Sequence, residues 1–209
     1  TRRSSDLADP SAEIPLVLLA LGGEVVLRNA RKRRTLPASE FFQGMLMTAR
    51  APDELVEQVR FPLAQPGQRS AFTEFSARHG DFAIVSAAAV RDARGLCLAI
   101  GGVSDRPRLA QWPAGLRGVD LDSALNDFAW ELEAQDDAHA SATFRRHLVR
   151  QLGAQDARGL ARGQFFTRQG VLVASTIKSI CCASSPAASS ALRAASAPIS
   201  LLKTPSAAK

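Results

Sequence analysis

The stretch that decides the fold runs Ser76-Ala77-Arg78-His79-Gly80-Asp81-Phe82-Ala83-Ile84-Val85 and continues as Ser86-Ala87-Ala88-Ala89. From residue 83 to 90 it consists of small and apolar residues, which is typical of a strand that can be buried on both faces. A turn follows at 92–95 and an apolar return strand at 96–100. With residues 70–76 as the preceding strand, the sequence predicts a three-stranded antiparallel sheet, followed by a loop from 101 to 109.

Two helices are predicted after this sheet, from apolar residues that recur at helical spacing. The first stripe comprises Leu121, Leu125, Phe128 and Leu132, and the second comprises Phe144, Leu148 and Leu152. The basic residues of the second helix are expected to face away from its stripe; they are Arg145, Arg146 and Arg150. Both helices are therefore expected to pack on the sheet as core.

The chain before Pro62 predicts a second mixed unit. Asp9 can cap a helix with Pro10 at its first position, and Gly22-Gly23 ends that helix. Further elements are read from alternation and composition: strands at 24–28, 32–36 and 55–61, and a short helix or loop with Phe41 and Phe42 at 38–44.

The positive charge of the chain is unevenly distributed. The formal net charge is +6, yet no acidic residue follows Asp156, whereas seven basic residues do. Without those seven, the body has 19 basic and 20 acidic residues and a net charge of −1. The remaining basic cluster, Arg28 and 31–34, is interpreted as a solvated hairpin turn. These features argue against a nucleic-acid-binding protein, which needs clustered positive charge on its surface.

Other function classes are excluded by what the sequence lacks. No apolar run reaches the ~20 residues that span a bilayer, and the three cysteines form neither a disulfide framework nor an iron–sulfur spacing. A reducing cytoplasm fits this cysteine usage. The sequence shows no nucleophile triad, acid–base pair or metal-ligand cluster, so we predict no catalytic residue and no metal site in this chain.

Three motifs in one order carry a resemblance to a known family. The first is the opening stretch. The second comprises Arg34-Thr35-Leu36-Pro37, Phe41-Phe42-Gln43-Gly44, Thr48, Pro52-Asp53-Glu54-Leu55 and Val59-Arg60-Phe61-Pro62. The third is the run Asp-Ala-His-Ala-Ser-Ala-Thr-Phe-Arg-Arg-His-Leu at 137–148. Together they resemble the FAD-carrying medium subunits of molybdenum hydroxylases, the group of the carbon monoxide dehydrogenase medium subunit and the xanthine dehydrogenase flavin domain.

The resemblance implies an α+β fold in which a partial, PCMH-like FAD-binding subdomain precedes the small sheet packed with helices. It divides the chain into the second part of an FAD-binding domain at 1–62 and a carbon monoxide dehydrogenase flavoprotein C-terminal-like domain at 69–153. Residues 163–209, rich in Ala and Ser, are predicted to be a disordered tail.

The function implied by the resemblance is that of an oxidoreductase subunit. It would pass electrons from 2Fe–2S clusters on a small partner subunit, through FAD, to an acceptor. A large partner subunit would hold the molybdopterin cofactor. An alternative is a truncated, non-catalytic remnant that docks to those subunits without retaining FAD.

The resemblance also implies six cofactor-binding positions: Ser5, Asp9, Glu13, Arg50, Phe72 and Thr73. Ser5 closes the counterpart of a phosphate-binding glycine motif, in which Arg3 and Ser4 stand where the family has glycines. Glu13 is equally explained as a first-turn acid that the helix dipole favours, and Phe72 as a core aromatic. The lost glycines predict that this chain alone binds FAD weakly or not at all, because the backbone must approach the phosphates closely.

Overall fold

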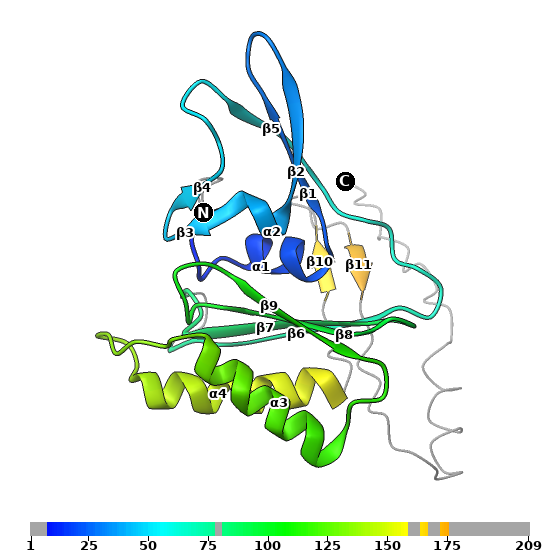
Figure 1. The fold of residues 1–209 in the computed structure, drawn as a ribbon, viewed down its shortest axis with the longest axis vertical. Helices are drawn as coiled ribbons and strands as arrows, with labels where there is room; N and C mark the ends of the chain where they lie inside the picture. The colour runs from blue at the N-terminus through cyan, green and yellow to red at the C-terminus, as the bar shows by residue number, and fades with distance from the viewer. Residues whose placement is uncertain (1–7, 78–80, 159–163, 167–171, 176–209) are drawn as a thin grey trace, which may run out of the picture.

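The computed structural model describes residues 8–77, 81–158, 164–166 and 172–175. A four-stranded antiparallel sheet has the order β6-β7-β8-β9 (Arg69–Phe75, Val85–Arg91, Gly95–Gly101 and Arg108–Pro113). Helices α3 (Gly118–Glu131) and α4 (Ala142–Arg158) cover one face of this sheet, and α1 (Glu13–Ala20) covers the other (Figure 1). The predicted α+β class is confirmed.

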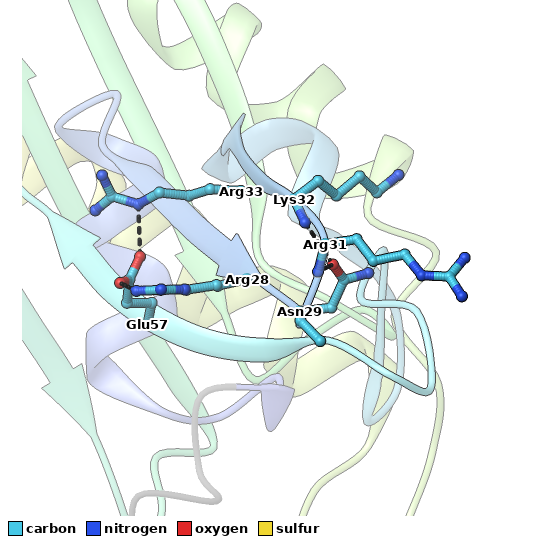
Figure 2. Close-up of a pocket in the computed structure, with 7 residues that line it drawn as sticks. Arg28, Asn29, Arg31, Lys32, Arg33 and Glu57 are labelled. Carbon is cyan, nitrogen blue, oxygen red and sulfur yellow. Dashed lines mark hydrogen bonds and ion pairs between the residues drawn. The ribbon is translucent and has the colours of Figure 1, made fainter.

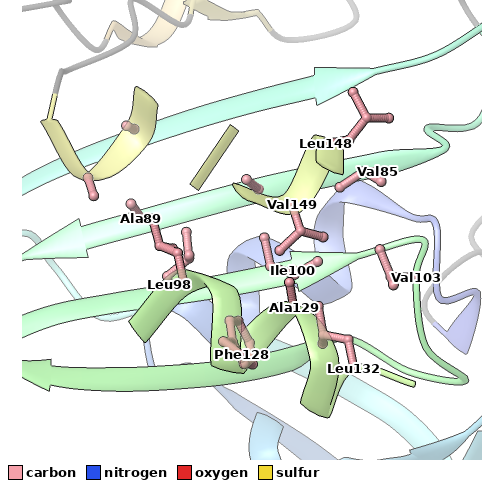
Figure 3. Close-up of a cluster of buried hydrophobic side chains, with 14 of the residues drawn as sticks. Val85, Ala89, Leu98, Ile100, Val103, Phe128, Ala129, Leu132, Leu148 and Val149 are labelled. Carbon is pink, nitrogen blue, oxygen red and sulfur yellow. The ribbon is translucent and has the colours of Figure 1, made fainter. Parts of the chain in front are cut away.

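The core of this half lies between the sheet and the two helices. Val85, Leu98 and Ile100 from the strands pack on Phe128 of α3 and Val149 of α4 (Figure 3). Each such side chain contributes roughly 1.5–3 kcal/mol when fully buried. The strand β7 is buried on both faces as its composition predicts, because Ala88 and Val90 face α1 on the opposite side.

A second, three-stranded antiparallel sheet has the order β2-β1-β5 (Arg33–Pro37, Glu24–Arg28 and Leu55–Arg60). Its hairpin projects away from the larger sheet (Figure 1). The short helix α2 (Ala38–Phe41) leads into the two-stranded pair of β3 (Phe42–Gly44) and β4 (Met47–Thr48).

Helix α1 lies between the two sheets and joins their cores. Leu18 and Leu19 pack with Val25, Leu27 and Phe41 of the smaller unit. The remaining buried side chains of α1 that face the larger sheet are Leu16 and Ala20. A short helix that is apolar on all sides is stable only in such a sandwiched position.

Two predicted boundaries were wrong. The larger sheet has four strands rather than three, because β9 pairs with β8 where a loop to 109 was expected, and Trp112 of β9 packs edge-on against Phe128 at 5.9 Å. Helix α1 begins at Glu13, not Pro10, with Ala12 as its N-cap and no side-chain cap. The Asp9 carboxylate instead accepts the Ser11 N–H at 2.8 Å and holds a turn.

The expected orientation of Arg145 was also wrong. Arg145 is buried, whereas Phe144 is 39% exposed, so the inward face of α4 is shifted at its first turn, while Leu148 and Leu152 of the predicted stripe still pack on the core. The shift occurs because Arg145 has backbone carbonyls and an aspartate as partners inside the fold.

Within the predicted tail the structure describes one antiparallel pair, β10 (Gln164–Phe166) with β11 (Leu172–Ser175). This pair departs from the expectation of disorder over 163–209. The rest of that prediction falls outside the described residues.

Candidate functional site

The turn that leads into α1, residues 8–12, is called the entry segment here. The Ala12 N–H donates to the Asp9 carbonyl at 3.1 Å, which closes the turn. Its two sides are held by different parts of the fold: the Leu46 N–H donates to the Ala8 carbonyl at 3.2 Å, and the Gly102 N–H donates to the Pro10 carbonyl at 2.8 Å. The entry segment is therefore fixed between the β3–β4 hairpin and the end of β8.

Two glycines make this close approach possible. A Cβ on Gly101 would lie 3.1 Å from the Pro10 carbonyl oxygen and 2.8 Å from the Ser86 hydroxyl. Gly102 has φ +78°, and a Cβ there would lie 2.9 Å from the carbonyl oxygens of Ala83 and Ile84. A side chain at Gly101 would press on the Pro10 carbonyl of the entry segment, and one at Gly102 would clash with the chain at 83–84.

The first turn of α1 presents an acid at its N-terminus. Glu13 is half-buried there, four residues after Asp9, where the helix dipole favours negative charge. A carboxylate accepts hydrogen bonds from hydroxyl groups, but repels phosphate. The Glu13 carboxylate therefore suits a ligand hydroxyl better than a phosphate, while the Asp9 carboxylate is used within its own turn.

An exposed apolar tip adjoins the entry segment. Met45, Leu46 and Met47 are 64%, 67% and 62% exposed, and Leu46 has φ 55°. Three consecutive exposed apolar residues in a hydrogen-bonded hairpin are unusual on a surface without a ligand or partner. This tip was not predicted, although its signal, the run Met-Leu-Met after Gly44, is visible in the sequence.

The other predicted positions are not gathered at this place. Arg50 is exposed and donates to the carbonyls of Glu54 and Ala51, at 2.6 and 3.2 Å, so it braces its own loop. Phe72 packs beneath α1 with Leu16 and Ala88. Ser5 lies outside the described residues.

Thr73 follows Phe72 in β6 and therefore faces the opposite side of the sheet. Its hydroxyl donates to the Asp156 carboxylate of α4 at 3.0 Å. Phe72 and Thr73 thus cannot line one surface together, and Thr73 contacts α4, whereas the entry segment bonds to Gly102 beside α1.

Two buried acids were not singled out from the sequence. Glu54 is 1% exposed and accepts Arg34 Nε and Nη2, each at 2.7 Å, and hydrogen bonding to Arg34 lowers the pKa of its carboxyl group to about 2. Burial raises the pKa of Asp156 to about 7, against the opposing effect of the Thr73 hydrogen bonds. In the described part of the chain, no three His, Cys, Asp or Glu side chains group as metal ligands.

The basic hairpin forms a shallow hollow of about 400 Å³ at the β1–β2 turn. Arg28 and Arg33 pair with Glu57 at 3.0 and 2.6 Å, which lowers the pKa of the Glu57 carboxyl group, while Arg31 and Lys32 point away from it (Figure 2). The side chains of Arg28, Arg31, Lys32 and Arg33 are exposed, as expected for a solvated hairpin. Arg34 departs from that interpretation, because it is half-buried and pairs with Glu54.

The donor set fits FAD in part. Glu13, directly after the entry segment, can accept a hydrogen bond from a ribityl or ribose hydroxyl, and the exposed apolar tip can pack against a ring system. The backbone surface of Gly101 and Gly102 is in contact with the Pro10 carbonyl and is not open to a phosphate. Phosphate contacts would therefore fall to the predicted motif at 1–5, outside the described residues.

No described helix is both long enough and apolar enough to cross a membrane.

Comparison with known proteins identifies the family of the chain. Residues 7–64 match the family model described as the FAD binding domain in molybdopterin dehydrogenase. The 6-hydroxypseudooxynicotine dehydrogenase complex subunit alpha of Paenarthrobacter nicotinovorans is 32% identical over 155 residues, which are 68% of this chain and 52% of that protein. The nicotine 6-hydroxylase medium subunit of the same organism is 35% identical over 155 residues, 69% of this chain and 54% of that subunit.

The fold is shared with a solved carbon monoxide dehydrogenase. The reconstituted enzyme from Oligotropha carboxidovorans contains a chain with a TM-score of 0.66 and 21% identity, and the match covers 73% of this chain and 57% of that one. The chain spans about half the length of the curated relatives it matches. By the matched domain, the relatives and the shared fold, it belongs to the family of FAD-binding medium subunits of molybdenum hydroxylases.

Proposed function

We propose that this chain is the flavin-holding part of a molybdenum hydroxylase-type oxidoreductase. When bound, FAD supplies the redox chemistry that connects 2Fe–2S clusters on a small partner subunit with an external electron acceptor. The large partner subunit holds the molybdopterin cofactor, and the assembly works in the cytoplasm. The family membership and the geometry of the entry segment support this proposal.

The residues of this chain bind and orient the cofactor; none of them transfers electrons. Glu13 accepts a hydrogen bond from a hydroxyl of the ribityl or ribose group, and Asp9 keeps the turn before it in shape. Ser5 donates to a phosphate. The Met45–Met47 tip covers apolar surface of the ligand and keeps water away from it.

The remaining predicted positions have supporting roles in this proposal. Phe72 packs under α1 and sets the height of that helix above the sheet. Arg50 fixes the loop that follows the β3–β4 hairpin. Thr73 supports the fold from the opposite face of the sheet to Phe72, where its hydroxyl donates to Asp156 of α4.

The single observation that carries the proposal is the entry segment, held by hydrogen bonds on both sides and followed at once by Glu13. It is tested by titrating the chain with FAD and following the quenching of flavin fluorescence. We expect saturable one-to-one binding with a dissociation constant on the order of 100 µM, about −5.5 kcal/mol. The weakness follows from Arg3 and Ser4 at the glycine positions.

Glu13→Gln is expected to weaken this binding several-fold, since an ionised acceptor is replaced by a neutral one. The matched control is Glu40→Gln, which makes the same charge change on the exposed face of α2 and is expected to leave the affinity unchanged. Flavin that stays unbound at millimolar FAD, or equal losses in the two variants, would remove the support for the proposal.

A further inference from the structure

A buried arginine of the C-terminal half contacts the chain next to the entry segment. Arg145 is the fourth residue of α4 and is only 6% exposed. Its guanidinium donates to the Ile84 carbonyl at 2.7 Å, to the Gly102 carbonyl and to the Asp137 carboxylate. A buried charge is tolerated only when its hydrogen bonds are satisfied, so these contacts are needed together.

The Asp137 carboxylate completes the arrangement from the loop before α4. Hydrogen bonding to Arg145, and then to the N–H groups of Ala140 and His139, holds the pKa of Asp137 well below its usual range. Asp137 therefore stays ionised throughout the neutral range and keeps Arg145 in one position. A guanidinium with several fixed partners has little freedom to move.

Gly102 connects Arg145 to the entry segment. Its carbonyl accepts from Arg145, and its N–H donates to the Pro10 carbonyl at 2.8 Å. Gly102 has φ +78°, a conformation that favours glycine, and a Cβ there would lie 2.9 Å from the carbonyl oxygens of Ala83 and Ile84. Gly102 therefore links Arg145 to Pro10 through the two backbone groups on either side of one Cα atom.

We propose that Arg145 is a positioning residue for the flavin side of the molecule. Arg145 lies in the C-terminal half and fixes the position of Gly102. Gly102 in turn holds the entry segment, and the entry segment fixes the start of α1 with Glu13. The effect of Arg145 on flavin affinity rests on the proposed function, whereas its effect on the position of the entry segment concerns the protein alone. It assigns to α4 a role in cofactor affinity without contact with the cofactor.

The test compares Arg145→Lys with a matched control, Arg91→Lys. Lysine keeps the charge but lacks the planar fork that reaches several acceptors. Arg91 likewise donates from β7 to a backbone carbonyl of α4, Ala157 at 2.9 Å, but at the opposite end of both elements. Amide hydrogen exchange is measured by mass spectrometry without FAD, and the FAD dissociation constant is then measured for each variant.

In Arg145→Lys we expect exchange at residues 8–16 and at Gly102 to accelerate about tenfold or more, while β7 and the rest of β8 keep wild-type rates. FAD affinity should fall about tenfold in the same variant. Arg91→Lys should change neither. Should Arg145→Lys not fold, Asp137→Asn keeps the two carbonyl bonds and should give smaller changes in the same peptides.

Three results overturn the inference: unchanged exchange at 8–16, equal changes in the Arg91 variant, or faster exchange with unchanged FAD affinity. Wild-type protein that binds no FAD would instead refute the proposed function and the flavin part with it. The exchange data would then still decide whether Arg145 holds the entry segment.

Discussion

Among single residues, two buried carboxyl groups titrate in opposite directions. Glu54 is held ionised by Arg34, and hydrogen bonding lowers its pKa to about 2. Asp156 has no cation to offset its burial, which raises its pKa to about 7, and its Oδ1 has no hydrogen-bond partner among the described residues. Stability should therefore depend on pH in two separate windows.

Asp156 lowers stability as the pH rises. In the unfolded chain an aspartate titrates near ~3.9, so between about pH 4 and pH 7 only the folded state keeps the proton. The contribution is complete below the unfolded pKa and is lost through pH 7. We expect Asp156→Asn to stabilise the protein at pH 8 by about 1–3 kcal/mol and to have little effect near pH 4. Urea unfolding at both pH values measures this.

The exposed Asp127→Asn on α3 serves as the control and should leave the pH profile unchanged. Parallel profiles for wild type and Asp156→Asn would show that Asp156 titrates as an ordinary aspartate.

Glu54 acts in the opposite sense. Its lowered pKa means that its contribution is present above pH ~4.3, the unfolded value, and is lost as the pH falls towards 2. At pH 7, Glu54→Gln should lower the melting temperature by about 5 °C or more, because Arg34 loses its buried partner. The difference from wild type should narrow at pH 3, within the window in which this contribution is lost. Differential scanning calorimetry at pH 7 and pH 3 tests both points.

Glu57→Gln provides the comparison for an exposed pair of the same chemistry. Glu57 also binds two arginines, but solvent screens them, so the melting temperature should change by less than about 2 °C. Equal losses in the two variants would show that burial of Glu54 adds nothing.

At the scale of elements, the position of α4 depends on a glycine. A Cβ on Gly153 would lie 2.8 Å from Leu125 Cδ2 of α3 and 3.0 Å from Leu98 Cδ2 of β8. Both contacts are with side chains in the close-packed core between the sheet and the helices. The helix therefore lies as close to its neighbours as a residue without a side chain allows.

Gly153→Val should destabilise the protein by about 1–3 kcal/mol, because the core has no space for the added methyl groups. Gln155→Val places the same β-branched residue on the exposed face of α4 and measures its helix propensity alone. Chemical denaturation compares the two. A cost no greater for Gly153→Val would mean that α4 can shift outward freely.

The whole molecule depends on α1, since its side chains belong to both core clusters. A fragment of residues 63–158 would lack α1 and expose Ala88, Val90 and Ala99 of the larger sheet. We expect this fragment to bind a hydrophobic dye and to melt without cooperativity. A chain of residues 1–158 should keep a cooperative melt, because the described core clusters end at Ala157.

Circular dichroism melts and dye fluorescence of the two fragments make the comparison. Cooperative melting of residues 63–158 would show that the domain after residue 69 is stable alone. Loss of the transition in residues 1–158 would show that the segment beyond 158 is part of the fold.

Much of the local structure was predictable because it depends on residues close in the sequence. The period-two pattern at 24–28 and 55–61 gave β1 and β5, and the small residues at 83–90 gave β7 between two layers. The Leu121 stripe gave α3. The motifs gave the family, and with it the identity of the cofactor, which no single contact in this chain encodes.

Other features were decided only by tertiary contacts. The rotation of α4 could not be read from its sequence, because Arg145 and Phe144 are one residue apart. Burial of the Arg145 charge becomes favourable only where the folded chain brings it the carbonyls of Ile84 and Gly102 together with the Asp137 carboxylate. The opposite placement of Phe72 and Thr73, and the titration of Asp156, likewise depend on what packs against each face of β6. Sequence pattern determined which segments become helices and strands; burial and hydrogen bonds between distant residues determined which side chains meet, because those depend on the assembled layers.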